Sequence, residues 1–397
     1  MFRLSRYLIV ALCLLTAACS YFEPAAPADD QTLDGPIAGL TQEQSRQFNA
    51  GDRAFNDEIF TSATGLGPIF VSNSCGSCHA ADGKGHPFST LTRFGQIDDK
   101  GNQFLHLGGP QLQHRALPGY TPEQIPAGAT FSKILPPATT GLGYIMHIPD
   151  DTLVSWSDPN DTDNDGISGR VNRIKIPWYV VPHQNASVEN GTYIGRLGKK
   201  AAVYNLLQQT ANAYNQDMGI TSTYEPKDVY SNLVIEPEVS NKTIADVVFY
   251  LETLKAPTPR NQNDPTVQKG RAIFNEIGCQ KCHKPSTTTG PAPIAVLAHR
   301  TIWPYSDFLL HDMGSALDDG YTEGSAQTAE WRTPPLWGLG LSKISQGGQY
   351  FLLHDGRAKS IEEAIHWHGG EGEASKNKFK QLNTQEKKAL IQFLESL

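Results

Sequence analysis

The chain carries the pattern Cys-x-x-Cys-His twice, at residues 75–79 and again at residues 279–283. This spacing is the attachment signature of a c-type haem, in which both thiols bond to one porphyrin and the histidine binds its iron. Zinc binding or thiol redox chemistry would use the cysteine pairs, but neither needs the trailing histidine. The pattern therefore predicts two covalent haems. The predicted thioether residues are Cys75, Cys78, Cys279 and Cys282, and the predicted proximal iron ligands are His79 and His283.

The first residues resemble a bacterial export signal. Arg3 and Arg6 precede an apolar run over residues 7–18, which is too short to span a membrane and is typical of a signal peptide over residues 1–18. The small residues before Cys19 resemble a lipoprotein processing site, at which this cysteine becomes lipidated; the alternative is ordinary cleavage without a lipid. We therefore expect a protein on the periplasmic side, an outer-membrane lipoprotein held to the membrane by its N-terminal lipid alone.

The cysteine count and the charge limit the chemistry further. Six cysteines are present, and all those beyond residue 19 belong to the haem motifs, so thiol–disulfide exchange through the protein's own sulfur is not expected. The net charge of −8 disfavours nucleic-acid binding. An acidic surface suits a basic redox protein that donates or accepts electrons, because long-range attraction speeds their encounter.

A faint internal repeat predicts the elements that must position these motifs. The string Gly-x-x-x-Phe-Asn occurs at residues 51–56 and at residues 270–275, before each motif. Each half also ends in an apolar pattern with helical spacing, over residues 244–254 and 390–397, and Asn383 supplies a capping signal before the second. Each half is therefore expected to contain a helix, a haem loop and a closing helix, as a cytochrome c domain does.

The predicted fold is mainly α with long irregular loops and two cytochrome c-like domains. The domains are expected over residues 40–257 and 266–397, joined by a proline-rich linker. Residues 85–240 are rich in Gly, Pro, Asn and Asp, and we expect them to form irregular loops with a few short strands. These loops make an insertion that enlarges the first domain.

An aspartate-rich loop in the first half has the pattern of a calcium site. Asp161, Asp163 and Asp165 alternate and precede a glycine, so their oxygens could converge on one ion while the glycine permits the turn. Asn172 stands where an EF-hand loop would supply a bidentate glutamate. The alternatives are a solvated polar turn or pairing of the aspartates with Arg170 and Arg173.

Three segments resemble one known family. They are the aspartate loop at 161–169, residues 305–314 and residues 332–338, and they follow the order found in the bacterial di-haem oxidoreductase family. Members of that family are also called thiol oxidoreductases or di-haem peroxidase-like proteins. The resemblance covers nearly the whole chain beyond the signal, and it implies a redox function with two haems. The second half is more distantly similar to bacterial di-haem cytochrome c peroxidases.

The similarity to those peroxidases implies a sixth ligand for the second haem. In them, a Thr/Pro-rich segment, a His-Asp-Gly turn and a Glu-Glu-Ala helix lead to a methionine that ligates the iron. That position falls on His368 here, so the resemblance implies a bis-histidine haem with a lower potential than methionine would give. His366 is the second choice. The alternative is that the segment around Trp367 only packs on the porphyrin.

The sequence leaves the sixth ligand of the first haem open. The residues considered are His86, His106, His114 and Met146 from the same half, and His311 and Met313 from the other half. By analogy with the peroxidases, this haem is expected to have an open position. Peroxide chemistry there would need an acid–base group, for which the candidates are Gln113, His114, His311 and Asp312.

The leading prediction is a di-haem c-type oxidoreductase. Electrons would pass from the bis-histidine haem to the open haem, which reduces hydrogen peroxide or oxidises an unknown substrate. One alternative is an electron-transfer cytochrome with both haems six-coordinate. A second alternative, implied by the resemblance alone, is a redox helper in bacterial iron uptake. The enlarged first half without an evident sixth ligand favours an enzyme over a carrier.

Overall fold

The computed structural model describes residues 28–98 and 101–397, and one compact unit spans Leu33–Leu397. A short N-terminal unit ends at Thr32, and its described part holds a 3-10 turn over Asp29–Gln31. The predicted signal peptide, residues 1–18, and the predicted lipidation residue Cys19 lie outside the described residues. Within the described ranges, no helix combines the length and apolar character needed to cross a membrane.

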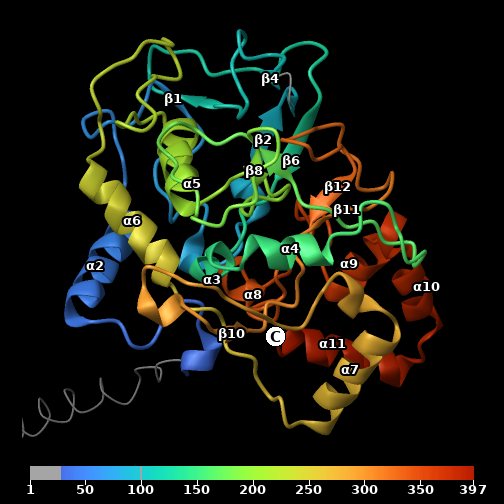
Figure 1. The fold of residues 1–397 in the computed structure, drawn as a ribbon. Helices are drawn as coiled ribbons and strands as arrows, with labels where there is room; N and C mark the ends of the chain where they lie inside the picture. The colour runs from blue at the N-terminus through green and yellow to red at the C-terminus, as the bar shows by residue number, and fades with distance from the viewer. Residues whose placement is uncertain (1–27, 99–100) are drawn as a thin grey trace, which may run out of the picture. The chain divides into compact units, whose positions relative to one another are not determined.

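Helices account for 33% of the chain, which confirms the mainly α prediction. Figure 1 shows two pairs of long helices side by side, α2 with α6 and α7 with α11. Two π-helical turns, Arg53–Asp57 and Ala213–Asp217, extend α2 and α5. The α-helices are α2 (Gln42–Asp52), α3 (Leu142–Met146), α4 (Asp150–Trp156), α5 (Leu206–Asn212), α6 (Asn241–Thr253), α7 (Pro265–Glu276), α8 (Ser342–Ser345), α9 (Ile361–Trp367), α10 (Glu373–Gln381) and α11 (Thr384–Glu395).

The first helix pair explains the first copy of the sequence repeat. A capping box begins α2, because Thr41 and Gln44 exchange hydrogen bonds between side chain and backbone. Gly51 lies where α2 crosses α6, and a Cβ atom there would overlap the carbonyl oxygen of Asp246. The two backbones can approach this closely only at glycine. The crossing holds the π-helical turn of α2 beside the first Cys-x-x-Cys-His motif, where Phe55 lies against His79.

The second helix pair repeats this arrangement. Asp264 caps α7, and the predicted capping box of Asn383 and Glu386 begins α11. A Cβ atom on Gly270 would overlap the carbonyl oxygen of Ala389, so glycine is again required at the crossing. The repeated Gly-x-x-x-Phe-Asn string therefore marks two equivalent helix crossings, each of which leads into a haem motif.

Short antiparallel ladders connect the helices, as expected for the loop-rich region. Six two-stranded ladders occur within the described part of the chain. Three of the six lie wholly within residues 85–240, and α3, α4 and α5 also form there, which the composition did not predict. The ladders pair β1 (Ile69–Phe70) with β5 (Arg115–Ala116), β2 (Leu91–Phe94) with β6 (Phe131–Ile134), β3 (Ile97–Asp98) with β4 (Gly101–Asn102), β7 (Arg173–Ile174) with β8 (Tyr193–Ile194), β9 (Thr287–Thr288) with β10 (Thr301–Ile302) and β11 (Leu310–Asp312) with β12 (Glu330–Arg332).

Each helix pair has its own apolar core. Tyr250 of α6 is fully buried between α2 and α6, and Phe274 of α7 packs on Phe393 of α11 with ring centroids 5.4 Å apart. Burying each such aromatic ring stabilises the fold by roughly 1.5–3 kcal/mol. Both predicted domains, residues 40–257 and 266–397, lie within the one compact unit, and their boundary stays a prediction.

The two halves of the chain also interleave. The backbone N–H of Leu135 donates to the carbonyl of His354 at 2.7 Å, and Arg170 and Leu310 exchange two backbone hydrogen bonds. Gln346 donates to the carbonyl of Gly85 at 2.9 Å. Segments of the second half therefore help to build the surroundings of the first motif, and the loop-rich region reaches the second.

Candidate functional site

A central cavity of about 1210 Å³ joins the two Cys-x-x-Cys-His motifs. Its volume exceeds the roughly 300–1,000 Å³ usual for a pocket that holds one ligand. We call its two parts the His79 end and the His283 end. The His79 end is lined by Cys75, Cys78, His79, Phe55, Tyr214, Met218 and Leu251, and the His283 end by Cys279, Cys282, His283, Phe274, His368, Leu390 and Leu394.

His79 has the orientation and the charge state of a metal ligand. Its Nδ1 lies 2.9 Å from the carbonyl oxygen of Pro137, so Nδ1 donates and Nε2 remains available to the cavity. Burial lowers the pKa of His79 to about 4, although the bond to Pro137 opposes this shift. The imidazole is therefore neutral near pH 7, the form that binds iron.

His283 repeats this arrangement at the other end. Its Nδ1 lies 2.9 Å from the carbonyl oxygen of Tyr305, and burial lowers its pKa to about 4. Burial also raises the pKa of Cys75 and of Cys279 to about 12, so neither thiol ionises near neutral pH. Each motif places two thiols and a neutral histidine beside an apolar cavity, and this arrangement fits a covalent haem.

His368 lies at the His283 end, as the resemblance implied. Its Nδ1 is 2.7 Å from the carbonyl oxygen of Ala364, so Nε2 is again the available nitrogen, and burial lowers its pKa. His368 and His283 both line the central cavity. His366, the second choice, is half-exposed and lies near Glu362, outside the central cavity. Trp367 does not line this cavity either.

None of the predicted sixth ligands reaches the His79 end. Within the described residues, Met218 is the methionine that lines this end, and no sequence pattern pointed to it. Met218 is buried among apolar side chains at the end of the π-helical turn after α5. The predicted candidates outside the cavity lining are His86, His106, His114 and Met146, while His311 and Met313 line the His283 end.

His311 is held by ion pairs. Its Nε2 lies 3.0 Å from Asp307 and its Nδ1 lies 2.5 Å from Glu371, so both nitrogens donate. Burial alone would lower the pKa of His311, but Asp307, Cys282 and Glu371 raise it well above its usual range. His311 is therefore a charged group, 3.8 Å from the sulfur of Cys282, with no nitrogen left to accept a proton. These contacts do not suit the predicted acid–base role.

The other acid–base candidates from the sequence lie away from the His79 end. His114 and Asp312 are exposed, and neither lines the central cavity. The carboxylate of Asp312 accepts a hydrogen bond from the backbone of Gly314 at 2.7 Å. Gln113 is buried outside the cavity lining and donates to the carbonyl of Gln216 at 2.8 Å.

A polar group that the sequence did not indicate lies at the His79 end. Asp217 lines the cavity, and burial raises its pKa to about 6, although the side chains of Gln111 and Arg93 oppose the shift. Gln111 donates to the Asp217 carboxylate, and Arg93 is paired with Glu323 at 2.8 Å. A carboxyl group with this pKa can hold or release a proton near neutral pH. No motif joins these residues, since Arg93 lies in β2, Asp217 ends the π-helical turn after α5, and Gln111 comes from the segment between β4 and β5.

The aspartate loop forms beside the second motif. Oxygens of Asp161, Asp163 and Asp165 lie within 4.8 Å of one another, a spacing that could hold a cation. A carboxylate oxygen of Asp165 lies 2.9 Å from the ammonium group of Lys281, inside the second motif. Calcium binding stays a prediction. Asn172 is not available as a ligand, because it is buried and its amide oxygen accepts from the backbone N–H of Ser325 at 2.8 Å and from the Ser325 hydroxyl at 2.9 Å.

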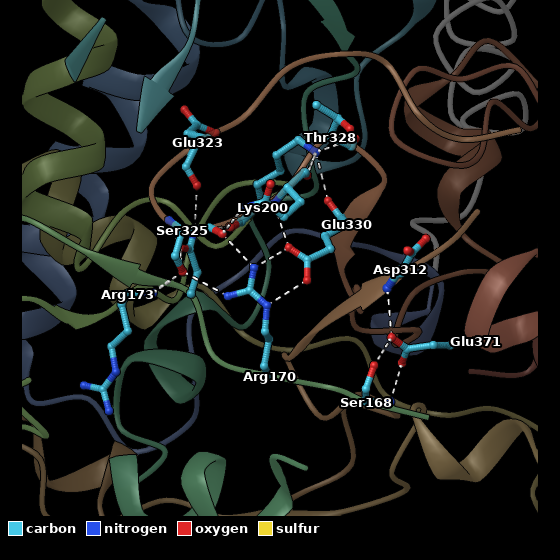
Figure 2. Close-up of polar contacts among 12 residues, drawn as sticks. Ser168, Arg170, Arg173, Lys200, Asp312, Glu323, Ser325, Thr328, Glu330 and Glu371 are labelled. Carbon is cyan, nitrogen blue, oxygen red and sulfur yellow. Dashed lines mark hydrogen bonds and ion pairs between the residues drawn. The ribbon is translucent and has the colours of Figure 1, made fainter. Parts of the chain in front are cut away.

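A polar network fixes the chain that follows this loop (Figure 2). Arg170 pairs with Glu330 and donates to Ser325, so the predicted alternative in which it pairs with the aspartates is wrong. Arg173 is also engaged elsewhere, 3.4 Å from Glu189. Ser168 donates to Glu371 through its backbone N–H at 3.1 Å and its hydroxyl at 2.9 Å. The network thereby ties the loop to the carboxylate that binds His311.

The paired motifs, the neutral histidines and the large apolar cavity are features of a haem-binding redox protein. Over residues 133–397, more than half of its length, the chain matches the family described as "Di-haem oxidoreductase, putative peroxidase". The chain therefore belongs to the di-haem oxidoreductase family, which confirms the resemblance seen in the sequence. The matched range includes the second motif and the aspartate loop, whereas the first motif precedes it.

Comparison with other known proteins adds little. No curated protein matches the chain. Among solved structures, hydrazine synthase from Kuenenia stuttgartiensis, pressurised with xenon, has 14% sequence identity and a TM-score of 0.41, over 95% of this chain and 98% of that one. This TM-score is too low to support a common fold.

Proposed function

We propose that the chain is an exported di-haem c-type oxidoreductase that acts on hydrogen peroxide. The observation that carries the proposal is the shared environment of His79, His283 and His368. Each ring is neutral, is oriented by a backbone carbonyl at Nδ1, and leaves Nε2 to the cavity. Such an outer hydrogen bond is what orients a histidine that binds a metal. His79 and His283 are the proximal ligands, and His368 is the sixth ligand at the His283 end.

The two ends have different roles in this proposal. His283 and His368 would both hold the haem iron at the His283 end, which suits electron transfer and would leave no site for peroxide. The His79 end has one histidine and a buried polar group, which suits substrate binding. We propose that electrons from a redox protein enter at the His283 end and are used at the His79 end. Haem iron supplies the redox chemistry when it is bound there.

The side chains at the His79 end would handle the proton. Asp217 has a pKa of about 6, so a fraction of it is protonated near neutral pH, and it can take a proton from one peroxide oxygen and return it to the other. Gln111 holds the Asp217 carboxylate in place. Arg93 adds positive charge, which favours negative charge that develops on the departing oxygen.

The test is a set of spectra of the purified holoprotein, with and without reductant and peroxide. We expect one low-spin iron and one high-spin iron, and a change on adding peroxide that is confined to the high-spin centre. His368→Ala should convert the low-spin centre to high-spin, whereas the matched His366→Ala should leave it unchanged. Two low-spin irons that do not respond to peroxide in any redox state would exclude the enzyme.

The second candidate function is an electron carrier with both haems six-coordinate. The observation in its favour is Met218, whose thioether lies at the His79 end and could be an axial ligand. Met218→Leu separates the two functions, with Met146→Leu as a control at a buried methionine outside the cavity lining. If the protein is an enzyme with an open haem, the unaltered protein, Met218→Leu and Met146→Leu should all show the same high-spin signal. A new high-spin signal in Met218→Leu alone would favour the carrier.

The remaining proposals concern the location of the protein and calcium binding at the aspartate loop. We propose export to the periplasmic side with a lipid on Cys19, tested by membrane fractionation and by Cys19→Ser. Calcium at Asp161, Asp163 and Asp165 is tested by calorimetric titration of the holoprotein after treatment with a chelator. Asp163→Asn should weaken calcium binding, and no heat of binding in the unaltered protein would exclude the site.

A further inference from the structure

Three cationic side chains from distant segments line the central cavity. Lys84 follows the first motif, Lys199 precedes α5, and Arg332 ends β12. Arg332 donates to the carbonyl oxygens of Gly198 at 2.9 Å and Thr333 at 3.4 Å. Within the described residues, neither lysine ammonium group has a hydrogen bond or ion pair, and no carboxylate pairs with any of the three. We call Lys84, Lys199 and Arg332 the basic cluster.

The members of the basic cluster lie close enough to influence one another. Burial, together with the charges of Lys84 and Arg332, lowers the pKa of Lys199 to about 7, although Asp355 opposes the shift. Nearby carboxylates are already engaged, since Asp355 pairs with Arg357 at 2.8 Å and Asp307 binds His311 at 3.0 Å. Like charges that face a cavity without a counter-ion are unfavourable, because water there does not fully solvate them.

A second, independent observation at this site is an unpartnered histidine. His354 lines the cavity and is 7% exposed, and neither of its ring nitrogens has a hydrogen-bond partner among the described residues. Its ring is stacked on Trp331 with centroids 3.7 Å apart and planes within 6°. The indole of Trp331 is held in turn, because its Nε1 donates to the carbonyl of Leu317 at 2.8 Å and the ammonium group of Lys200 lies 3.8 Å from the ring centroid. His354 is therefore fixed in place with its polar atoms unused.

We propose that the basic cluster and His354 form a carboxylate-binding site inside the central cavity. Two ammonium groups and a guanidinium supply the positive charge, and the planar guanidinium fork matches a carboxylate. The neutral imidazole adds a hydrogen-bond donor. The carboxylate comes either from a haem propionate or from a small acid in solution. Binding of a haem propionate rests on the proposed function, whereas binding of a small acid from solution does not.

The experiment compares the unaltered holoprotein with Lys84→Gln, Lys199→Gln and the double variant. Lys133→Gln is the control, because this lysine is exposed on β6 outside the cavity lining. Haem content is measured first, from the absorbance of the denatured haem. Midpoint potentials are then measured by spectroelectrochemistry, and sodium acetate is titrated calorimetrically against a sodium chloride background.

Each source gives its own result. If a propionate occupies the site, loss of positive charge beside it lowers the midpoint potential of one haem in the lysine variants and not in Lys133→Gln, while acetate does not bind. If the site takes a free acid, acetate binds the unaltered protein, and the double variant binds it at least tenfold more weakly. If the lysine variants keep the midpoint potentials of the unaltered protein and acetate does not bind, the carboxylate-binding site is refuted. A protein without haem would refute the proposed function, and the acetate titration alone would then decide the site.

Discussion

Replacing Glu371 with glutamine tests whether the buried ion pair stabilises the fold around the second motif. The Glu371 carboxylate accepts hydrogen bonds from His311 at 2.5 Å, from the backbone of Asp312 at 3.0 Å, and from Ser168 at 3.1 and 2.9 Å. The one oxygen of a glutamine can still accept from the Ser168 hydroxyl and the Asp312 backbone, but its amide nitrogen cannot accept from the Ser168 backbone or from His311, and the charge opposite His311 is lost. A hydrogen bond to a charged group contributes about 1.5–3 kcal/mol, so we expect Glu371→Gln to cost that much stability.

A larger loss is expected when the side chain is truncated. Glu371→Ala leaves the His311 imidazolium with one carboxylate and leaves the N–H groups of Ser168 and Asp312 without their acceptor. Breaking a buried pair by removing one partner costs about 3–5 kcal/mol. Both losses are measured as the free energy of unfolding of the holoprotein in urea, followed by circular dichroism.

The pH dependence gives a sharper test of the same pair. Burial raises the pKa of Glu371, but its bonds with His311 and Asp312 outweigh this effect and lower it below 4.5. Its contribution is present above pH 4.5 and is lost as the pH falls through the folded pKa. The pKa of His311 is raised well above 6.5, so its contribution is complete below pH 6.5 and is lost as the pH rises through the folded pKa. The free energy of unfolding of Glu371→Gln should therefore fall furthest below that of the unaltered protein between pH 4.5 and 6.5.

Asp312→Asn is the matched control, because its exposed carboxylate lies next to His311 in sequence and is not part of the buried pair. It should change the stability by no more than about 0.5 kcal/mol. An equal loss at every pH for Glu371→Gln would refute the ion pair, and so would a loss no larger than that of the control.

The remaining predictions concern the helix crossing, the proton-handling group and the sixth ligand. Gly270→Ala should cost about 1–3 kcal/mol in urea unfolding, because the new Cβ would overlap the carbonyl of Ala389. Asp217→Asn should lower the rate of peroxide reduction by about 10²–10⁴-fold, with haem content and spectra unchanged. His368→Met should raise the midpoint potential of one haem, because methionine favours ferrous iron, and His366→Met should not.

Each of these predictions has a result that would count against it. A Gly270→Ala protein as stable as a Gln268→Ala control, on an exposed part of α7, would mean that the helices separate without cost. An Asp217→Asn protein with full turnover would place the acid–base group elsewhere. If His368→Met left both potentials unchanged, His368 would not be bound to the second iron.

The sequence alone determined the local chemistry of this protein. Two Cys-x-x-Cys-His motifs, the Gly-x-x-x-Phe-Asn repeat and the cap at Asn383 each lie within a few consecutive residues, so their geometry follows from the backbone they occupy. The helices before and after each motif, and the family, were accessible in this way. His368 was accessible only through the resemblance, and the structure places it at the His283 end.

Only the tertiary structure decided which polar side chains meet. Gln111 and Asp217 are separated by 106 positions, and His311 and Glu371 by 60, through segments without regular periodicity. The structure assigned His311 to an ion pair, turned Asn172 away from the aspartate loop, and brought the basic cluster to the central cavity. These outcomes depend on how irregular loops pack against the two helix crossings, and that packing depends on contacts between distant residues that no local pattern specifies.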